Sequence, residues 1–391
     1  MSEVSAPPGQ EPVQEAGPTW RRKFVKGVLL PYLLVRFALA FALWVAKGLR
    51  SGGQPIDASH PDFWLHGWTR WDSGWYLRIA MDGYTAVADL RQESSLAFFP
   101  AYSYVIRWVH AVLPESLQGH DARVWIGVLL SNVSLLVALG LLHHCCERYF
   151  GRELDADRTV LYMLVSPAAF YFFCLYTESF FLLAAVTAFF FAFRQQWWLA
   201  GLAGLVLGMS RPTGILLAPA LAWLYLAQKG WRWRQIRWDV LALLLIPLGF
   251  ALVGYNAYLK SGEPLAIFKI QEAWGRALTS PIATFQPRHY PHPLVDPISR
   301  VMLVLFLGLG VVSLRRLSSP ALGIFALLSM APLWFTGTLT SVPRMLAVLF
   351  PIFALLSRYG RDSLVHQAIV LLGMSAQTLL VVIWGLELFV A

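Results

Sequence analysis

The 391-residue chain has little charge and little cysteine. Only 14% of its residues are charged and 57% are hydrophobic, whereas soluble domains average roughly 25% charged and 45–50% apolar residues. This imbalance excludes an ordinary soluble globular enzyme. Three cysteines, Cys145, Cys146 and Cys174, are too few for a disulfide framework. The first two are adjacent and poorly placed to pair, so we interpret all three as free thiols.

The chain also lacks the short signatures of several chemistries. No nucleotide-binding glycine loop, zinc signature or serine-nucleophile turn is present, and the sequence predicts no metal and no other cofactor. Asp155-Ala156-Asp157 matches the Asp-any-Asp signature of metal-dependent nucleotide-sugar enzymes, but three residues carry little weight. Without nucleotide machinery, a membrane enzyme needs a substrate that carries its own energy, such as a lipid-linked phosphosugar.

Apolar runs of membrane-spanning length are what the chain has in abundance, and no soluble stretch is long enough for another domain. We therefore expect an all-α polytopic membrane protein. Residues 1–20 are expected to form a disordered cytoplasmic tail, and residues 21–391 a single membrane domain. The net charge of +9 then reflects basic loops on one side of a membrane, and no nucleic-acid partner is predicted.

The positions of lysine and arginine set the expected topology. Basic residues precede the first apolar run, 28–48, and place the N-terminus in the cytoplasm. The run 98–114 is short and carries Arg107 and His110. We interpret it as an interfacial or re-entrant helix, because a span there would send the later basic loops outside. Those loops, which become cytoplasmic, are residues 144–158, 229–237, 315–319 and 357–362.

Two later runs, 159–194 and 198–228, are too long for one span each. The first would make a helix of about 54 Å, against a hydrocarbon core of about 30 Å. We expect both runs to fold back, with breaks near residues 176–179 and 210–214. This gives about eleven transmembrane helices, with nine as the alternative if neither run folds back.

The outer side then collects the residues suited to chemistry. A first outer loop, 49–122, is rich in aromatic residues and is expected to hold juxtamembrane helices, and a second outer loop covers 259–298. Asp72 of the first loop lies between tryptophans, where partial desolvation would strengthen it as a general base. The alternative is that Asp72 only caps the helix beginning at Ser73.

Other ionisable residues on this side have two interpretations each. Glu178 and Arg211 lie at membrane depth, which suggests function, although they could merely neutralise each other. Lys269 and Arg276 are seven positions apart and are predicted to share one helix face that could hold a phosphate, with a solvated face as the alternative. Arg344 begins a span at its outer end and either snorkels to the surface or reaches the same cavity.

Short motifs follow one another along most of the chain. They are Arg70–Ala80, Gly83-Tyr84, Phe98-Phe99-Pro100, Ser166–Ala169, Tyr176–Ser179, Ser210–Gly214, Phe268, Gln271, Trp274–Arg276 and Pro343-Arg344. This ordered set, from about residue 65 to residue 352, resembles the PIG-V-like mannosyltransferases. These are relatives of the enzyme that adds the second mannose of glycosylphosphatidylinositol anchors.

The resemblance implies a GT-C-type glycosyltransferase fold with a juxtamembrane 98–114 segment. It also implies an inverting transfer of mannose from a polyprenyl-phosphate donor without a metal. Asp72 matches the acidic residue of the first outer loop and would be the catalytic base. The residues that would bind substrate are Arg70, Trp71, Tyr76, Glu178, Arg211, Lys269, Gln271, Trp274, Arg276 and Arg344.

The acceptor stays open among a lipid, a glycan and a protein, and mannose is not distinguished from another hexose. The tail and compact loops look more like bacterial relatives, which predicts the inner membrane with the active site on its outer face. A second hypothesis is a transporter or flippase of lipid-linked sugars, which would be expected to show pseudo-symmetric halves. A scaffold subunit is the third.

Overall fold

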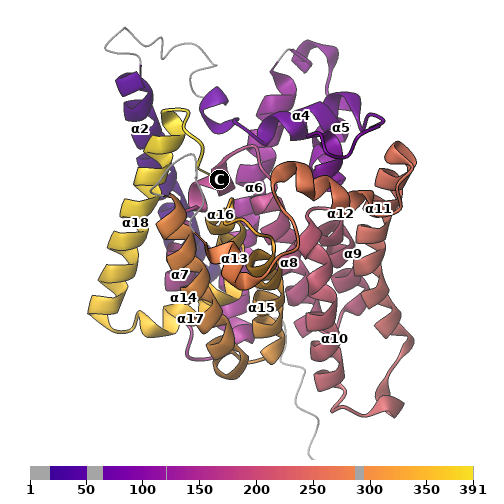
Figure 1. Cartoon of the computed structure of the whole chain (residues 1–391). Coiled ribbons are helices and arrows are strands. Elements are labelled where there is room, and N and C mark those ends of the chain that lie inside the picture. The colour runs from indigo at the N-terminus through magenta and orange to yellow at the C-terminus, as the bar shows by residue number, and fades with distance from the viewer. Residues whose placement is uncertain (1–17, 51–64, 120, 287–294, 391) are drawn as a thin grey trace, which may run out of the picture.

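A computed structural model describes residues 18–50, 65–119, 121–286 and 295–390, and over these residues it holds helices and no strand (Figure 1). Most of the tail expected over residues 1–20 lies outside the described residues, as do positions 51–64 and 287–294 of the two outer loops. The last three positions of that expected tail, 18–20, already belong to the first helix.

In the described part of the chain, four three-residue 3-10 helices lie in the connections, η2 (His66–Trp68), η3 (Ser95–Ala97), η4 (Glu115–Leu117) and η8 (Trp233–Gln235), and the longer helices are given in chain order. Up to the middle of the chain they are α1 (Pro18–Phe24), η1 (Val25–Leu29), α2 (Leu30–Arg50), α4 (Ser73–Asp82), α5 (Pro100–Ala111), α6 (Ala122–Cys145), η5 (Cys146–Phe150), α7 (Ala156–Leu164), η6 (Ala169–Phe173), α8 (Glu178–Phe193) and α9 (Trp197–Gly208). The rest are η7 (Pro212–Leu216), α10 (Leu217–Gln228), η9 (Trp238–Leu244), α11 (Leu245–Ser261), α12 (Ala266–Lys269), η10 (Ile270–Trp274), α13 (Pro281–Phe285), α14 (Val295–Arg316), α15 (Pro320–Phe335), α16 (Val342–Ala347), α17 (Phe350–Tyr359) and α18 (Ser363–Gly385).

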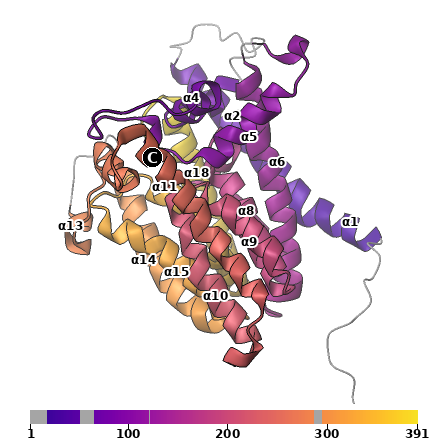
Figure 2. The ribbon, with the colours of Figure 1, turned by 90° about the vertical axis from the view of Figure 1, so that its right-hand side faces the viewer.

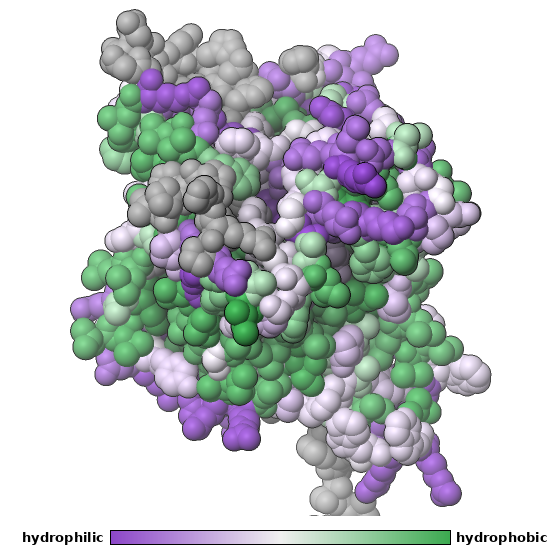
Figure 3. All heavy atoms as spheres, in the orientation of Figure 1, coloured by the Kyte–Doolittle hydropathy of each residue, from purple (hydrophilic) through white to green (hydrophobic). Residues whose placement is uncertain are grey.

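By length and apolar composition, 5 of the described helices could cross a membrane. They are Trp20–Arg50, Ala122–Phe150, Trp238–Ser261, Val295–Arg316 and Ser363–Gly385. An apolar surface lies between polar surfaces near the two ends of the molecule (Figure 3). These features indicate an integral membrane protein, whereas the expected eleven spans and the GT-C-type fold remain predictions.

Both expected breaks are present. The first long run is interrupted between α7 and α8, and the second between α9 and α10. Each run also folds back: the ring of Phe193, which ends α8, lies 5.6 Å from that of Phe150, which precedes α7. The rings of Trp197 at the start of α9 and Tyr225 near the end of α10 lie 4.8 Å apart. Figure 2 shows α8, α9 and α11 packed side by side.

The basic loops meet at one end of the bundle. The amide of Ser318 donates to the carbonyl of Phe150 at 2.9 Å, and the amide of Asp155 donates to Ser357 Oγ at 3.0 Å. The α10–α11 connection lies at the same end, where Gln228 Nε2 donates to the carbonyl of Ala192 at 3.0 Å (Figure 1). The structure therefore places these loops at one end of the bundle, and their assignment to the cytoplasmic side of a membrane stays a prediction.

The apolar run 98–114, which we interpreted as an interfacial or re-entrant helix, contains α5, which is 12 residues long. At 1.5 Å per residue this helix measures about 18 Å, well short of a hydrocarbon core of about 30 Å. Helix α5 packs against α4 at the end of the molecule away from the basic loops (Figure 1). The structure thus agrees with a juxtamembrane role for this segment.

Glycines bring α9 into backbone contact with η9 and α11. A Cβ atom on Gly208 would lie 2.5 Å from the carbonyl oxygen of Ile246, and one on Gly201 would lie 2.3 Å from that of Ala242. Small residues at such positions let membrane helices approach closely. Because Arg211 follows α9 directly, this contact also fixes where Arg211 enters the site.

Replacement of Gly208 by leucine should therefore force α9 away from α11. We expect Gly208→Leu to lower stability by about 1–3 kcal/mol, the usual cost of overpacking, measured as the thermal midpoint of the detergent-solubilised protein. Gly254→Leu is the matched control, because no atom lies within 4 Å of a Cβ at Gly254. Equal midpoints for the two variants would contradict the close packing.

The predicted orientation can be tested with single cysteines, because Cys145, Cys146 and Cys174 are buried. Leu278 of the second outer loop is 93% exposed and Trp233 of a basic loop is 74% exposed. In intact cells, a membrane-impermeant maleimide should label Leu278→Cys directly and Trp233→Cys only after the membrane is opened. The reverse pattern would invert the topology.

Candidate active site

Asp72 precedes α4, where a carboxylate would be expected to cap the helix. Its side chain makes no capping hydrogen bond. Instead, Arg344 Nη1 donates to Asp72 Oδ2 at 2.6 Å. The carboxylate is thus directed into the protein and away from the helix end, which removes capping as the explanation for Asp72.

Tyr176 holds the turn that carries Asp72. Its hydroxyl donates to the carbonyl of Arg70 at 2.9 Å and accepts from the amide of Asp72 at 3.2 Å. Next to it, Ser73 Oγ donates to the carbonyl of Leu175 at 3.0 Å. The segment before α8 therefore fixes the position of Asp72 through three hydrogen bonds.

Arg344 contacts two carboxylates, those of Asp72 and Glu178. It lies in α16, and its side chain is only 7% exposed. Besides Asp72, its guanidinium faces Glu178, with Arg344 Nε 3.3 Å from Glu178 Oε1. Its carbon Cζ also lies 5.1 Å from the ring centroid of Tyr176. Burial of one cation between two carboxylates and an aromatic face makes Arg344 the bridge between α4 and α8.

Glu178 and Arg211 complete this cluster. Arg211 Nη1 donates to Glu178 Oε1 at 2.8 Å, and the two side chains are 10% and 1% exposed. The mutual neutralisation considered from the sequence is therefore real, but Glu178 is shared with Arg344. Among the described residues, Glu178 Oε2 is buried without a hydrogen-bond partner. We name Asp72, Arg344, Glu178 and Arg211 the charged cluster.

The backbone is strained beside both ends of this cluster. Trp71 and Ser341 adopt left-handed conformations, with φ of 54° and 66°. Such a conformation costs a non-glycine residue about 1–3 kcal/mol and persists only where its surroundings enforce it. Arg344 Nη2 donates to Ser341 Oγ at 3.3 Å, so Ser341 is tied to the cluster that its turn helps to place. Strain at these positions is typical of functional sites.

The second outer loop packs against the first through Trp274. Its ring lies 5.3 Å from that of Phe98 and 6.0 Å from that of Trp75, both edge to face. Just beyond it, Arg276 Nη1 donates to Gln271 Oε1 at 3.1 Å. This contact brings a third arginine toward the charged cluster.

Two pKa values reflect the closeness of these groups. Burial, with the positive charges of Arg344 and Arg211, lowers the pKa of Arg276 to about 10, which still leaves it charged at neutral pH. Burial, with the negative charges of Glu178 and Asp72, raises the pKa of Tyr76 to about 12, so its phenol stays neutral. Tyr76 lies on the cluster side of α4, and its hydroxyl is 3.3 Å from Thr177 Oγ1.

Three residues predicted from the sequence to bind substrate, Lys269, Arg70 and Trp71, have their side-chain partners outside the charged cluster. Lys269 and Arg276 do not share a helix face, because η10 ends at Trp274 and Gly275 turns the chain in a left-handed conformation. Lys269 instead pairs with Glu263 at 2.7 Å near the surface. The expectation of a shared helix face was wrong, whereas phosphate binding by either residue stays a prediction.

Arg70 and Trp71 face the stretch that follows α18. Arg70 pairs with Glu387, and the exposed ring of Trp71 packs edge to face on Phe389 at 5.3 Å. Neither side chain contacts the charged cluster directly. Their contribution is to hold the turn before Asp72.

The Asp155-Ala156-Asp157 motif has structural partners at the opposite end of the bundle. Asp155 accepts from the amide of Arg158 at 2.9 Å and caps α7, while Asp157 Oδ1 lies 2.7 Å from His143 Nε2. Within the described ranges, no group of three or more histidine, cysteine, aspartate or glutamate side chains is placed to hold a metal.

Sequence reasoning missed the positioning residues. Tyr176, Tyr171 and Ser341 all contact Arg344 or the turn before Asp72. Tyr176 was visible in the motif that includes Glu178, but only as part of a helix break. Nothing in the spacing of Tyr171 or Ser341 signals their contacts with Arg344.

Part of the chain matches a known protein family. Residues 50–215 match the family model described as Mannosyltransferase (PIG-V). The matched range contains Asp72, Glu178 and Arg211, whereas Arg276 and Arg344 lie beyond it. No curated protein matches the chain. The match confirms the PIG-V resemblance over this part of the chain and supports a mannosyltransferase activity.

The buried pair of Glu178 and Arg211 should be energetically coupled. In a double-mutant cycle with Glu178→Gln and Arg211→Gln, we expect a coupling on the order of 1–3 kcal/mol, because each single variant leaves an uncompensated buried charge. The surface pair of Lys23 and Glu147, whose side chains are 59% and 31% exposed, should couple by about 0–1 kcal/mol. Thermal unfolding measures both, and equal couplings would contradict a special role for burial.

Proposed function

We propose that the protein transfers mannose from a polyprenyl-phosphate-mannose donor to a hydroxyl group of a lipid, glycan or protein acceptor on the non-cytoplasmic face of the membrane. The observation that carries the proposal is the orientation of Asp72, whose carboxylate faces a buried arginine instead of capping its helix. The PIG-V family match supports the sugar and the reaction class.

Asp72 is assigned as the general base. Its carboxylate takes the proton of the acceptor hydroxyl, and the freed electron pair forms the new bond from that oxygen to the anomeric carbon. The bond from this carbon to the phosphate oxygen breaks on the opposite face, and its electrons leave with the lipid phosphate. The anomeric configuration is thereby inverted, and no metal or other cofactor is needed for the balance.

The arginines are assigned to the departing phosphate. Arg344 pairs with Asp72, Arg211 pairs with Glu178, and the charge of Arg276 interacts with this cluster. Cations aimed at developing negative charge stabilise the transition state. In the structure, Arg344 Nη1 donates a hydrogen bond to Asp72 Oδ2. When a phosphate arrives, Arg344 exchanges the carboxylate for the phosphate, which frees Asp72 to accept a proton.

The remaining residues surround the sugar. Glu178 Oε2 is an unpartnered buried acceptor among the described residues, and Gln271 and Trp274 lie on the loop that reaches the cluster. We assign them to sugar hydroxyls and to the face of the sugar ring. Tyr76 supports the cluster from α4 through its neutral phenol.

The test is transfer by the purified protein. Incubation with polyprenyl-phosphate-mannose and a membrane lipid extract should yield a hexose-sized mass gain on an acceptor. Asp72→Asn should bind donor but lose about 10²–10⁴-fold in rate, the usual contribution of a general base. Asp82→Asn, an exposed change on the same helix, is the control. Wild-type turnover by Asp72→Asn would exclude Asp72 as the base.

Donor binding is measured separately on the same preparations. Arg344→Ala should weaken it, whereas Arg78→Ala, a change at an exposed position of α4, should not. Unchanged donor affinity in Arg344→Ala would remove this residue from the phosphate site. A wild-type protein that binds donor and moves it across a bilayer without transfer to any acceptor would favour the transporter hypothesis.

A further inference from the structure

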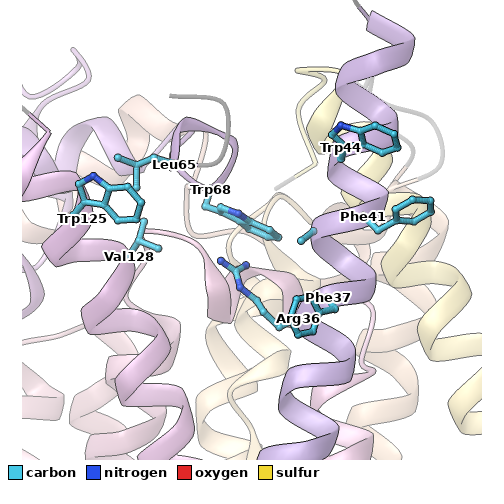
Figure 4. Close-up of a pocket in the computed structure, with 9 residues that line it drawn as sticks. Arg36, Phe37, Phe41, Trp44, Leu65, Trp68, Trp125 and Val128 are labelled. Atoms are coloured by element: carbon cyan, nitrogen blue, oxygen red, sulfur yellow. The ribbon is translucent and has the colours of Figure 1, made fainter. Parts of the chain in front are cut away.

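A cavity lies between α2 and α6, apart from the charged cluster. It measures about 630 Å³, which is within the range of ligand-binding pockets. Figure 4 shows Trp68 between the two helices, next to the side chain of Arg36. The cavity walls are mostly apolar and include Phe37, Phe41 and Trp44 from α2 and Trp125 and Val128 from α6.

The cavity holds one cation, Arg36. The residue lies within the first apolar helix, Trp20–Arg50, and its guanidinium extends from α2 into the gap (Figure 4). Its carbon Cζ lies 3.9 Å from the ring centroid of Trp68 and 5.0 Å from that of Phe173. Among the described residues, Arg36 Nη1 is buried without a hydrogen-bond partner. The aromatic faces orient the cation but provide no anion.

The cavity opens toward the lipid phase. Of its lining residues, Phe37 is 71% exposed, Phe41 64% and Trp125 51%, on helices that could cross the membrane. An arginine at this depth is costly unless it finds an anion. The anions that approach from a bilayer are the phosphates of lipid head groups. Charge and exposure therefore select an anionic lipid as the occupant.

The cavity is separate from the charged cluster. The segment from Phe173 to Tyr176 lies between them, with the Phe173 ring on the Arg36 side and the Tyr176 ring beside Arg344. A backbone hydrogen bond joins this segment to the first outer loop, because the amide of Leu175 donates to the carbonyl of Trp68 at 3.0 Å. A phosphate bound at Arg36 is therefore not the phosphate assigned to Arg344.

We propose that this cavity binds an anionic diacyl phospholipid, with Arg36 paired to its phosphate. Phe41, Trp44 and Trp125 flank the head group, and an acyl chain follows Phe37 along α2. Arg36 lies eight residues, about 12 Å, deeper than Trp44 along the helix, so the head group sinks into the groove. The lipid is distinct from the sugar donor, and the proposal does not depend on the proposed transfer reaction.

Native mass spectrometry of the full chain, stripped of lipid and titrated with phosphatidylglycerol or phosphatidylcholine, tests this site. We expect one tightly retained phosphatidylglycerol and at least tenfold weaker phosphatidylcholine. Arg36→Gln should weaken phosphatidylglycerol binding about tenfold. Arg78→Gln should not, although Arg78 also stacks on a tryptophan, with Cζ 4.8 Å from the Trp75 centroid.

A second variant covers the case in which Arg36→Gln does not fold. Ala40→Trp keeps the charge of Arg36 but fills the cavity that Ala40 lines, and it should cause the same loss. Unchanged phosphatidylglycerol affinity in a folded Arg36→Gln or Ala40→Trp protein would overturn the proposal. Equal affinity for the two lipids, or displacement of phosphatidylglycerol by an equal concentration of inorganic phosphate, would overturn it as well.

Discussion

The arrangement of the charged cluster depends on one buried guanidinium, that of Arg344. A charge removed from water is tolerated only where opposite charges and hydrogen bonds replace the lost solvent. Asp72 and Glu178 provide the charges, and Ser341 provides a further acceptor. Because these residues come from α4, α8 and the turn before α16, the need to satisfy Arg344 draws three distant segments together. Arg211 then balances the second carboxylate.

This charge balance suits the proposed reaction. As the acceptor proton moves to Asp72, one negative charge disappears from the carboxylate and one appears on the departing lipid phosphate. The total charge of the site stays constant. The protein therefore needs only to stabilise a negative charge that moves from the Asp72 carboxylate to the nearby phosphate. Arg344 can serve both positions, and such fixed, preoriented cations are the usual source of electrostatic catalysis. The strained turns at Trp71 and Ser341 are consistent with a site held in place in advance.

Much of the architecture was predictable because it follows from local physical limits. Helix length against bilayer thickness required breaks in the runs 159–194 and 198–228, and both are present. The distribution of arginine and lysine predicted which loops share one end. Together these arguments placed Asp72, Glu178, Arg211 and Arg344 on the same side, where the structure brings them into contact.

The pairings themselves could not be predicted from the sequence. Spacing suggested a common face for Lys269 and Arg276, but Gly275 reverses the chain between them, a signal of helix termination that the sequence did contain. The partner of Arg70, by contrast, lies beyond α18 and has no signature in the sequence. Arg36 Nη1, which has no hydrogen-bond partner among the described residues, likewise became visible only when the cavity around it was known. Side-chain partners distant in the chain are a property of the packed bundle.

The contact between the first outer loop and α18 has a consequence for biosynthesis. Trp384 Nε1 donates to the carbonyl of Gly67 at 2.8 Å across 317 positions of sequence, close to the turn that carries Asp72. At about 5–20 residues per second, the ribosome reaches α18 roughly 15–60 s after the loop has been made. During this time the loop lacks its hydrogen bond from Trp384, which can form only after α18 has been inserted. A nascent chain acquires its complete site late, and a defect in the insertion of α18 would abolish that site without altering any of its residues.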